Sequence, residues 1–501
     1  MRVLIFHGYL LRGTGSNVYN AGLAQALSTL GHEVHLLCQD RDAQRLPWVG
    51  GSGAGSVTVH VPDIGGLLPV YVADRYEGYE VKTFPELSDA ELDRYLSANV
   101  TAVREVVEGA GAPDAALANH LIMGPVILAR AGLEFALKVH GSDLSYTVRP
   151  HPERFVPLAL EGAEAAAGIL VGSGHTAADL FATVPGGDLA AKTRLGPPGV
   201  DVKRFRPRPR PDADQGIASL AEALEGERPQ EGDSFSRDGP LAAAALRRWL
   251  QGSPRVLSVG KLLVNKGVDL LIAAWPLVHR RHIADGAAPR LLLAGFGAYR
   301  AGAEALIEAL GRGDLEAARA VAAAGRRYED GEEGPLPILS RFLAAPPSGY
   351  EQAARDAAGS IVLCGRLEHD EVAEVMPAAD AFVMPSTFPE AFGMVPAESA
   401  ACGVPPVSAD HSGMREVSRQ LAEAVPAELG RLLSFAVDDG AIEALAERVG
   451  GWLDLDAEER SRVGVALSER VAELWSWESV AEGVIAASHG EFDRLPPVTV
   501  E

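Results

Sequence analysis

Two glutamates, Glu390 and Glu398, stand on either side of a Phe-Gly turn where a helix is expected to begin, with seven residues between them. A helix N-terminus presents unpaired N–H groups and a partial positive charge that suit a diphosphate. The first carboxylate can accept hydrogen bonds from sugar hydroxyls. The second, about one turn inside the helix, can hold both hydroxyls of a ribose. The pattern predicts a site for a nucleotide-sugar.

Two lysines, Lys261 and Lys266, lie in a loop over residues 260–267, between a predicted strand and a predicted helix. The loop lacks the glycine spacing and the Lys-Ser/Thr ending of a Walker A motif. Its two ammonium groups could converge on a diphosphate and neutralise it as it leaves; the alternative is a solvated loop with ordinary surface lysines. Because the chain carries a net charge of −23, an anionic ligand needs such local positive groups.

A glycine-rich loop containing Gly13, Thr14 and Gly15 follows the first predicted strand, 2–6, and leads into a helix over 17–30. Backbone N–H groups at such a helix start can contact a phosphate or an acceptor. A packing role for the glycines is the alternative.

His140 ends a predicted strand over 135–139 and is followed by Gly-Ser-Asp. The carboxyl ends of parallel strands line the ligand crevice of a doubly wound sheet, which makes His140 a candidate for hydrogen bonding to a sugar. A structural histidine is the alternative. Asp143 is either a carboxylate near the reaction centre or the N-cap of a short helix.

Strands that end in small or polar residues alternate with helices through both halves of the chain, as in right-handed βαβ units. We therefore expect an α/β fold of two doubly wound, Rossmann-like domains that face each other across a cleft. The predicted strands are 2–6, 33–38, 115–118, 135–139 and 168–171 in the first half, and 256–259, 290–294, 361–364, 381–384 and 404–408 in the second.

The predicted domains are an N-terminal domain over 1–205 and a C-terminal domain over 254–474, which carries a helical insertion at about 310–355. Residues 206–253 are interpreted as an interdomain connection enlarged by a partly helical insertion. Its proline-rich start, 206–212, is not expected to form a helix.

The composition argues against several classes of protein. A net charge of −23 and a pI near 5.0 disfavour a nucleic-acid partner. Three cysteines without short spacing indicate a reducing cytoplasm rather than a disulfide or zinc framework. No apolar run reaches the ~18 residues of a membrane span, which leaves only peripheral membrane contact open. Asp-x-Asp strings at 40–42, 212–214 and 454–456 are interpreted as turn residues and solvated acids, so no metal site is predicted.

Together these motifs resemble glycosyltransferase family 4, whose fold is GT-B. The resemblance extends over nearly the whole chain and is most specific in the glutamate run. It is carried by residues 31–34, 140–143, 198–201, 205–207, 260–267, 365–366, 379–380, 385–403 and 475–478. By the same resemblance, the tail from about 475 to 501 contains a C-terminal helix that crosses back to the first domain.

The resemblance implies roles for the glutamate run. Glu390 would contact hydroxyls of the donor sugar, and the amides of Phe392, Gly393 and Met394 would meet the sugar and the phosphate. Glu398 would hold the ribose.

The resemblance also implies that Lys261 and Lys266 hold the diphosphate, that Arg366 lies in the loop that meets the base, and that His140 touches the donor sugar near its anomeric carbon. One position departs from the family, in which the first cation of the lysine loop is commonly arginine. Lys261 supplies a point charge rather than a bidentate fork.

The predicted function is that of a retaining, metal-independent glycosyltransferase that moves a sugar from a UDP-sugar or GDP-sugar to an acceptor and needs no other cofactor. The resemblance favours departure and attack on the same face, with the phosphate oxygen accepting the acceptor's proton. A nucleotide-sugar epimerase, a sugar phosphorylase or hydrolase on the same fold, and a binding protein without turnover are the alternatives.

Overall fold

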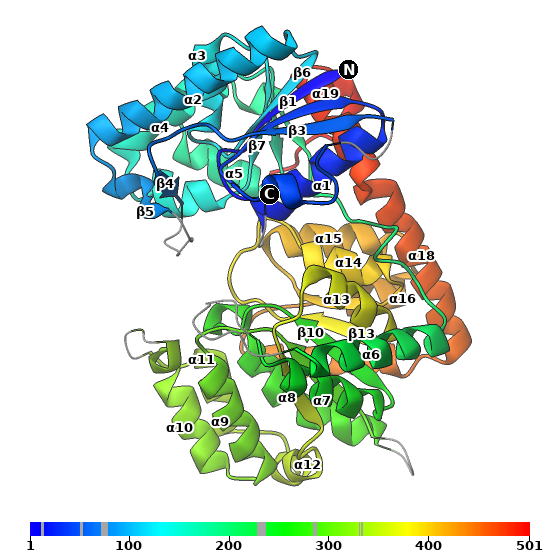
Figure 1. Cartoon of the computed structure of the whole chain (residues 1–501). Coiled ribbons are helices and arrows are strands. Elements are labelled where there is room, and N and C mark those ends of the chain that lie inside the picture. The colour runs from blue at the N-terminus through cyan, green and yellow to red at the C-terminus, as the bar shows by residue number, and fades with distance from the viewer. Residues whose placement is uncertain are drawn as a thin grey trace. The chain divides into compact units, whose positions relative to one another are not determined.

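The computed structural model describes residues 1–11, 15–50, 54–71, 79–227, 237–283, 288–329, 331 and 334–500. The chain forms two compact units (Figure 1): Met1–Gly199 with Trp475–Glu501, and Val200–Leu474. Each unit is built on one parallel sheet flanked by helices. The predicted α/β class with two Rossmann-like halves is confirmed.

The sheet of the first unit has the strand order β3-β2-β1-β6-β7-β8-β9, and every pair is parallel. The order reverses between β1 and β6, so the carboxyl ends of these two strands flank a topological switch point, where doubly wound folds bind ligands. The strands are β1 Arg2–Phe6, β2 Glu33–Leu37, β3 Ser56–His60, β6 Ala115–Asn119, β7 Ala136–Val139, β8 Gly168–Val171 and β9 Thr193–Leu195. A separate parallel pair is formed by β4 Leu67–Val70 and β5 Glu80–Thr83.

Both faces of this sheet are buried, which explains its continuous apolar strands. In β1, Leu4 and Phe6 belong to a core with helices α2, α3 and α4, whereas Val3 and Ile5 belong to a core with α1 and α19. The alternation follows the two-residue period of a strand. The helices are α1 Ser16–Thr29, α2 Asp89–Ala110, α3 Gly124–Ala131, α4 Pro152–Ala165, α5 Gly174–Thr183 and α19 Trp477–Ser488.

The sheet of the second unit has the order β12-β11-β10-β13-β14-β15, again parallel throughout. Its switch point lies between β10 and β13, the two strands that lead into the lysine loop and the glutamate run. The strands are β10 Arg255–Val259, β11 Arg290–Ala294, β12 Ile361–Gly365, β13 Ala381–Met384, β14 Pro406–Ala409 and β15 Ser434–Phe435; helices used below are α8 Val268–His282, α13 His369–Val375, α14 Met394–Ala401, α15 Ser412–Ala422, α17 Ala441–Leu453 and α18 Ala457–Trp475.

The structure differs from the predicted connection over 206–253. Helices α6 Arg210–Glu225 and α7 Gly239–Leu250 pack on each other, α7 also packs on β12 and β11, and both belong to the second unit, which begins at Val200. The expectation that 206–212 is not helical is wrong from Arg210 onward. Pro211 occupies the first turn of α6, where its missing N–H has no helical partner to lose.

A helical stretch between β11 and β12 includes the predicted insertion at about 310–355. It comprises α9 Arg300–Gly311, α10 Leu315–Ala324, α11 Pro337–Ala344 and α12 Tyr350–Asp356, which Figure 1 shows as one group of helices. Across the described residues, no helix is both long and apolar enough to cross a membrane.

The C-terminal segment from Trp475 onward is part of the first unit. Helix α19 packs against α1, and the Trp477 indole lies 5.7 Å from the Tyr19 ring, centroid to centroid. Gly22 and Gly199 both lie against this indole, so closely that a Cβ on either glycine would overlap it. Glycine at these positions therefore permits the tail helix to dock.

We expect Gly22→Ala to lower the midpoint of thermal unfolding. Alanine gains about 1 kcal/mol of helix propensity over glycine, but the overlap with Trp477 costs roughly 1–3 kcal/mol or more. Gly109→Ala in α2 is the matched control, because a Cβ there meets no described atom within 4 Å; it should raise the midpoint. Equal midpoints for wild type and Gly22→Ala would contradict the packing of α19 on α1.

Candidate functional site

The lysine loop and the glutamate run lie against each other at the switch point of the second sheet. Gly267, the N-cap of α8, has φ 65°, and a Cβ there would overlap the carbonyl oxygen of Pro385. The Asn265 carbonyl accepts a hydrogen bond from the Thr387 N–H at 2.9 Å and lies 3.1 Å from the Ser386 hydroxyl oxygen. Residues about 120 positions apart in the chain thus form one surface.

Lys266 and Glu390 form an ion pair between these two loops. The Ser386 hydroxyl donates a second hydrogen bond, of 2.9 Å, to the same carboxylate oxygen. The side chains of Lys266 and Glu390 are 27% and 20% exposed, so a ligand can reach both. The sequence assigned one to the diphosphate and the other to the sugar; the structure shows that each also orients the other. Lys261, in contrast, is exposed.

Residues that follow β11, including Glu329 of the insertion, also hold the lysine loop. The Val264 N–H donates to Oε1 of Glu329 at 2.6 Å, and the Leu262 N–H and carbonyl bond to Phe296 and Tyr299 at 2.8 and 3.0 Å. Asp269, in the first turn of α8, is fully enclosed, and burial raises the pKa of its carboxyl to about 7. The sequence offered no motif for this support, because its parts come from loops far apart in the chain.

Helix α14 begins in the glutamate run, as predicted, with Gly393 as its N-cap. No described side chain caps this helix. Its positive end therefore suits an anion beside Lys266 and Glu390.

Glu398 lies inside α14, is only 4% exposed, and pairs with Nε2 of His369 at 2.8 Å. Burial acts to lower the pKa of His369, but the hydrogen bond and charge of Glu398 outweigh it and hold that pKa above its ordinary value. Nearby, Arg366 pairs with Glu368 at 2.8 Å and lies 5.9 Å from the Phe296 ring centroid. His369 was not singled out from the sequence.

The first unit has its own polar cluster at the ends of β1 and β6, next to His140. Nε2 of His140 lies 2.7 Å from Oδ1 of Asn119, whose amide nitrogen donates to Asn20, which in turn donates to Nδ1 of His7 at 3.0 Å. Burial, followed by the neighbouring positive groups, lowers the pKa of His140 well below its ordinary value. A neutral ring that donates from Nε2 keeps its Nδ1 lone pair.

Asp143 has the geometry of the N-cap alternative. It is 0% exposed, and its oxygens accept the N–H groups of Leu144, at 3.0 Å, and Leu121. His120, 3.7 Å from the same carboxylate, has φ 63° and bonds to the Ser16 hydroxyl at 3.0 Å.

Of the glycine loop, Gly13 and Thr14 lie outside the described residues, and Gly15 is the exposed N-cap of α1, with φ 63°. The polar residues that sequence reasoning missed are His7, Asn20 and His369. Position in the sequence could have pointed to two of them. His7 directly follows β1 at the switch point, and His369 begins the helix after β12.

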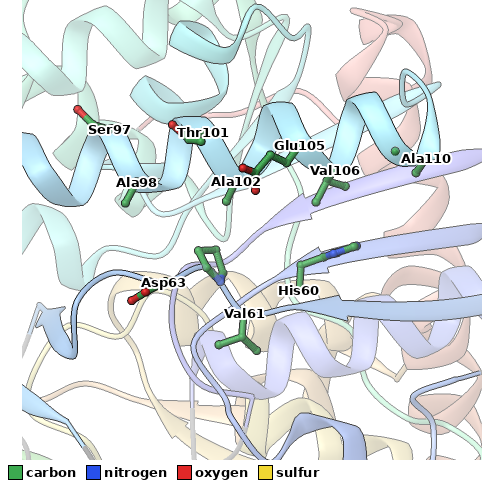
Figure 2. Close-up of a pocket in the computed structure, with 12 residues that line it drawn as sticks. His60, Val61, Asp63, Ser97, Ala98, Thr101, Ala102, Glu105, Val106 and Ala110 are labelled. Carbon is green, nitrogen blue, oxygen red and sulfur yellow. The ribbon is translucent and has the colours of Figure 1, made fainter.

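A hollow of about 730 Å³ in the first unit is unrelated to this chemistry. Figure 2 shows it between α2 and residues 60–63, with Glu105 and Asp63 among its lining residues. Its described lining contains no Lys or Arg, so it does not suit a diphosphate.

Residues 350–466 match the family of Glycosyl transferases group 1, and this match covers Arg366, Glu390 and Glu398. The chain is 25% identical over 450 residues to a GDP-mannose-dependent alpha-(1-6)-phosphatidylinositol monomannoside mannosyltransferase of Mycobacterium tuberculosis, over 86% of this chain and 89% of the relative. The chain is thus similar to group 1 glycosyltransferases over residues 350–466 and to a mannosyltransferase over most of its length.

Solved structures show that this chain has the predicted GT-B fold. Sucrose-phosphate synthase from Thermosynechococcus elongatus superposes with a TM-score of 0.57 at 18% identity, covering 98% of this chain and 99% of that one. Anabaena HepE in complex with UDP and glucose superposes with a TM-score of 0.54 at 16% identity, covering 97% and 98%. The predicted resemblance to glycosyltransferases, the fold and the enzyme class are confirmed.

The ion pair of His369 and Glu398 predicts how the thermal stability of the protein depends on pH. The pKa of His369 is higher in the folded than in the unfolded protein, so its pair with Glu398 stabilises the fold while the histidine is protonated. This stabilisation is fully present below the unfolded pKa of about 6.5 and is lost as the pH rises through the folded pKa. The thermal midpoint of wild type should therefore exceed that of His369→Asn most at low pH. A difference that grows with pH would contradict this assignment.

Proposed function

We propose that this glycosyltransferase moves a sugar from a nucleoside diphosphate sugar to an acceptor hydroxyl, with retention and without a metal. The observation that carries the proposal is the ion pair of Lys266 and Glu390 beside the start of α14. This arrangement puts a cation, a helix N-terminus and a carboxylate within one surface. Those are the groups that a diphosphate joined to a sugar requires.

The reaction separates charge. The bond between the anomeric carbon and the phosphate oxygen breaks, the acceptor oxygen bonds to the same face of that carbon, and the departing phosphate takes the acceptor's proton. Negative charge grows on the diphosphate while the sugar becomes oxocarbenium-like. Lys266, Lys261 and the amide groups at Gly393 and Met394 would stabilise that charge without reorganisation, which supports a metal-independent reaction.

Binding would change the partner of Lys266. In the structure its ammonium pairs with the Glu390 carboxylate, so neither charge is left alone. With the donor bound, Lys266 would turn part of its charge to the diphosphate while Glu390 accepts hydrogen bonds from sugar hydroxyls. From the first unit, His140 would contact the sugar near its anomeric carbon. As a neutral ring, it adds no positive charge next to the developing cation.

The nucleoside would bind along α14 and the loop after β12. Glu398 would hold the ribose hydroxyls in place of, or together with, His369, and Arg366 would meet the base. The mycobacterial relative is named as GDP-mannose-dependent, and HepE binds UDP and glucose. GDP-mannose and UDP-glucose are therefore the first donors to test. Net transfer of sugar to an acceptor, with the anomeric configuration preserved, supports the proposal; an epimer of the donor, or a product only with free phosphate, overturns it.

Lys266→Ala should lower kcat by roughly 10²-fold or more, because it removes a charge that is most useful in the transition state. Steady-state rates with the active donor measure this. Lys203→Ala, a lysine of the same unit outside the lysine loop, is the control and should retain the wild-type rate. A wild-type kcat for a correctly folded Lys266→Ala enzyme would refute the assignment.

Glu398→Ala should mainly raise the donor KM, with a loss of about 1.5–3 kcal/mol for charge-assisted hydrogen bonds to the ribose. Because each 1.4 kcal/mol corresponds to about tenfold, the expected increase is roughly 10- to 150-fold. Donor titrations of initial rate provide the measurement, and an unchanged KM would show that the ribose binds elsewhere.

A further inference from the structure

The start of α15 closes over the loop that carries Glu390. The Glu390 carbonyl accepts the Gly413 N–H at 2.9 Å, and the Glu390 N–H donates to the Ser412 hydroxyl oxygen at 2.9 Å. The approach is close, since a Cβ at Gly413 would lie 2.6 Å from the carbonyl group of Ala391. Both backbone polar groups of Glu390 are therefore held by residues that follow β14.

Ser412 adopts a backbone conformation that serine rarely takes. Its φ is 52°, and among the described residues only His120 is another non-glycine with positive φ. A left-handed conformation costs an L-residue roughly 1–2 kcal/mol and persists where surrounding contacts require it. At Ser412 the contact that accompanies it is the hydroxyl bond to Glu390.

The hydrogen bonds around Ser412 have only one consistent set of directions for a neutral His411. Nε2 of His411 lies 2.8 Å from the Ser386 carbonyl, which can only accept, so Nε2 carries the proton. Nδ1 then has the lone pair and accepts from the Ser412 hydroxyl at 3.1 Å. The Ser412 oxygen is left to accept the Glu390 N–H.

The cycle closes through Ser386. Its hydroxyl donates to the Glu390 carboxylate at 2.9 Å, while its carbonyl accepts from His411. Four residues, Ser412, Glu390, Ser386 and His411, thus form a ring of hydrogen bonds when the single Ser386 hydroxyl proton points to the charged Glu390 carboxylate, its nearest acceptor, rather than to the Asn265 or Phe388 carbonyl at 3.1 Å. The carboxylate oxygen that Lys266 contacts belongs to this ring.

We propose that His411 and Ser412 are positioning residues that fix Glu390 for the sugar half of the donor. They contact the loop of Glu390, whereas Glu398 and His369 belong to the proposed nucleoside end. The inference rests on the proposed function and adds that separate sets of residues orient the sugar and bind the nucleoside. Loss of the Ser412 hydroxyl misorients the sugar in the transition state and leaves nucleotide binding intact.

The test compares Ser412→Ala with Ser412→Gly. Both remove the hydroxyl, but glycine adopts positive φ freely and alanine does not, so the pair separates the hydrogen bond from backbone strain. Ser418→Ala is the matched control: Ser418 is a buried serine of the same helix, and its hydroxyl bonds to the Leu433 carbonyl at 3.3 Å. Rates are measured with GDP-mannose or UDP-glucose, and thermal shifts with GDP or UDP alone.

We expect both Ser412 variants to lose at least about tenfold in kcat, with a smaller change in donor KM and an unchanged thermal shift by the nucleoside diphosphate. Ser418→Ala should match wild type. The inference is overturned if the Ser412 variants retain wild-type kcat, if only the alanine variant is impaired, or if the nucleotide shift disappears together with the activity. Failure of the wild-type protein to respond to any nucleotide or to transfer sugar instead refutes the proposed function.

Discussion

The interaction on which the second unit's site depends is the ion pair between Lys266 and Glu390. It joins two loops that leave neighbouring strands at a topological switch point, and it exists only because β10 and β13 are adjacent although far apart in sequence. A lysine and a glutamate in contact are stable without ligand, because each neutralises the other. The same two groups can then be shared with a ligand that carries negative charge at one end and hydroxyls at the other.

The surroundings of this pair explain why it is oriented. Gly267 lets the two loops touch, Glu329 of the insertion fixes the backbone of the lysine loop, and Ser412 with His411 fixes the backbone of Glu390. Each support comes from a different crossover of the sheet. Electrostatic catalysis requires such preorganisation. Dipoles that must rotate during the reaction cost reorganisation energy, which reduces their stabilisation of the transition state.

The polar cluster around His140 in the first unit differs in its chemistry from the ionic site of the second unit. Around His140 the described polar side chains are amides and imidazoles linked in series, with Asp143 kept on backbone N–H groups. Burial keeps His140 and His7 neutral at physiological pH, with the pKa of His7 lowered to about 3. Lys138, two residues before His140, is 2% exposed, and burial lowers its pKa to about 7 while its ammonium donates to the Gly196 carbonyl at 2.5 Å. The cluster around His140 thus provides hydrogen bonding through neutral amides and imidazoles, in contrast to the ionic site of the second unit.

By itself the sequence determined the α/β class, most strands, the start of α14 and the residue types of the site, because these follow from local periodicity, helix-end chemistry and motifs that resemble a known family. Only the tertiary structure decided which residues are partners. It paired Lys266 with Glu390 and Glu398 with His369, placed α6 and α7 in the second unit, and bent Ser412 into a left-handed conformation. The physical reason is that an ion pair, a close backbone approach or a strained φ arises from segments brought together by strand order. Neither the spacing within one segment nor its hydrophobic pattern carries that information.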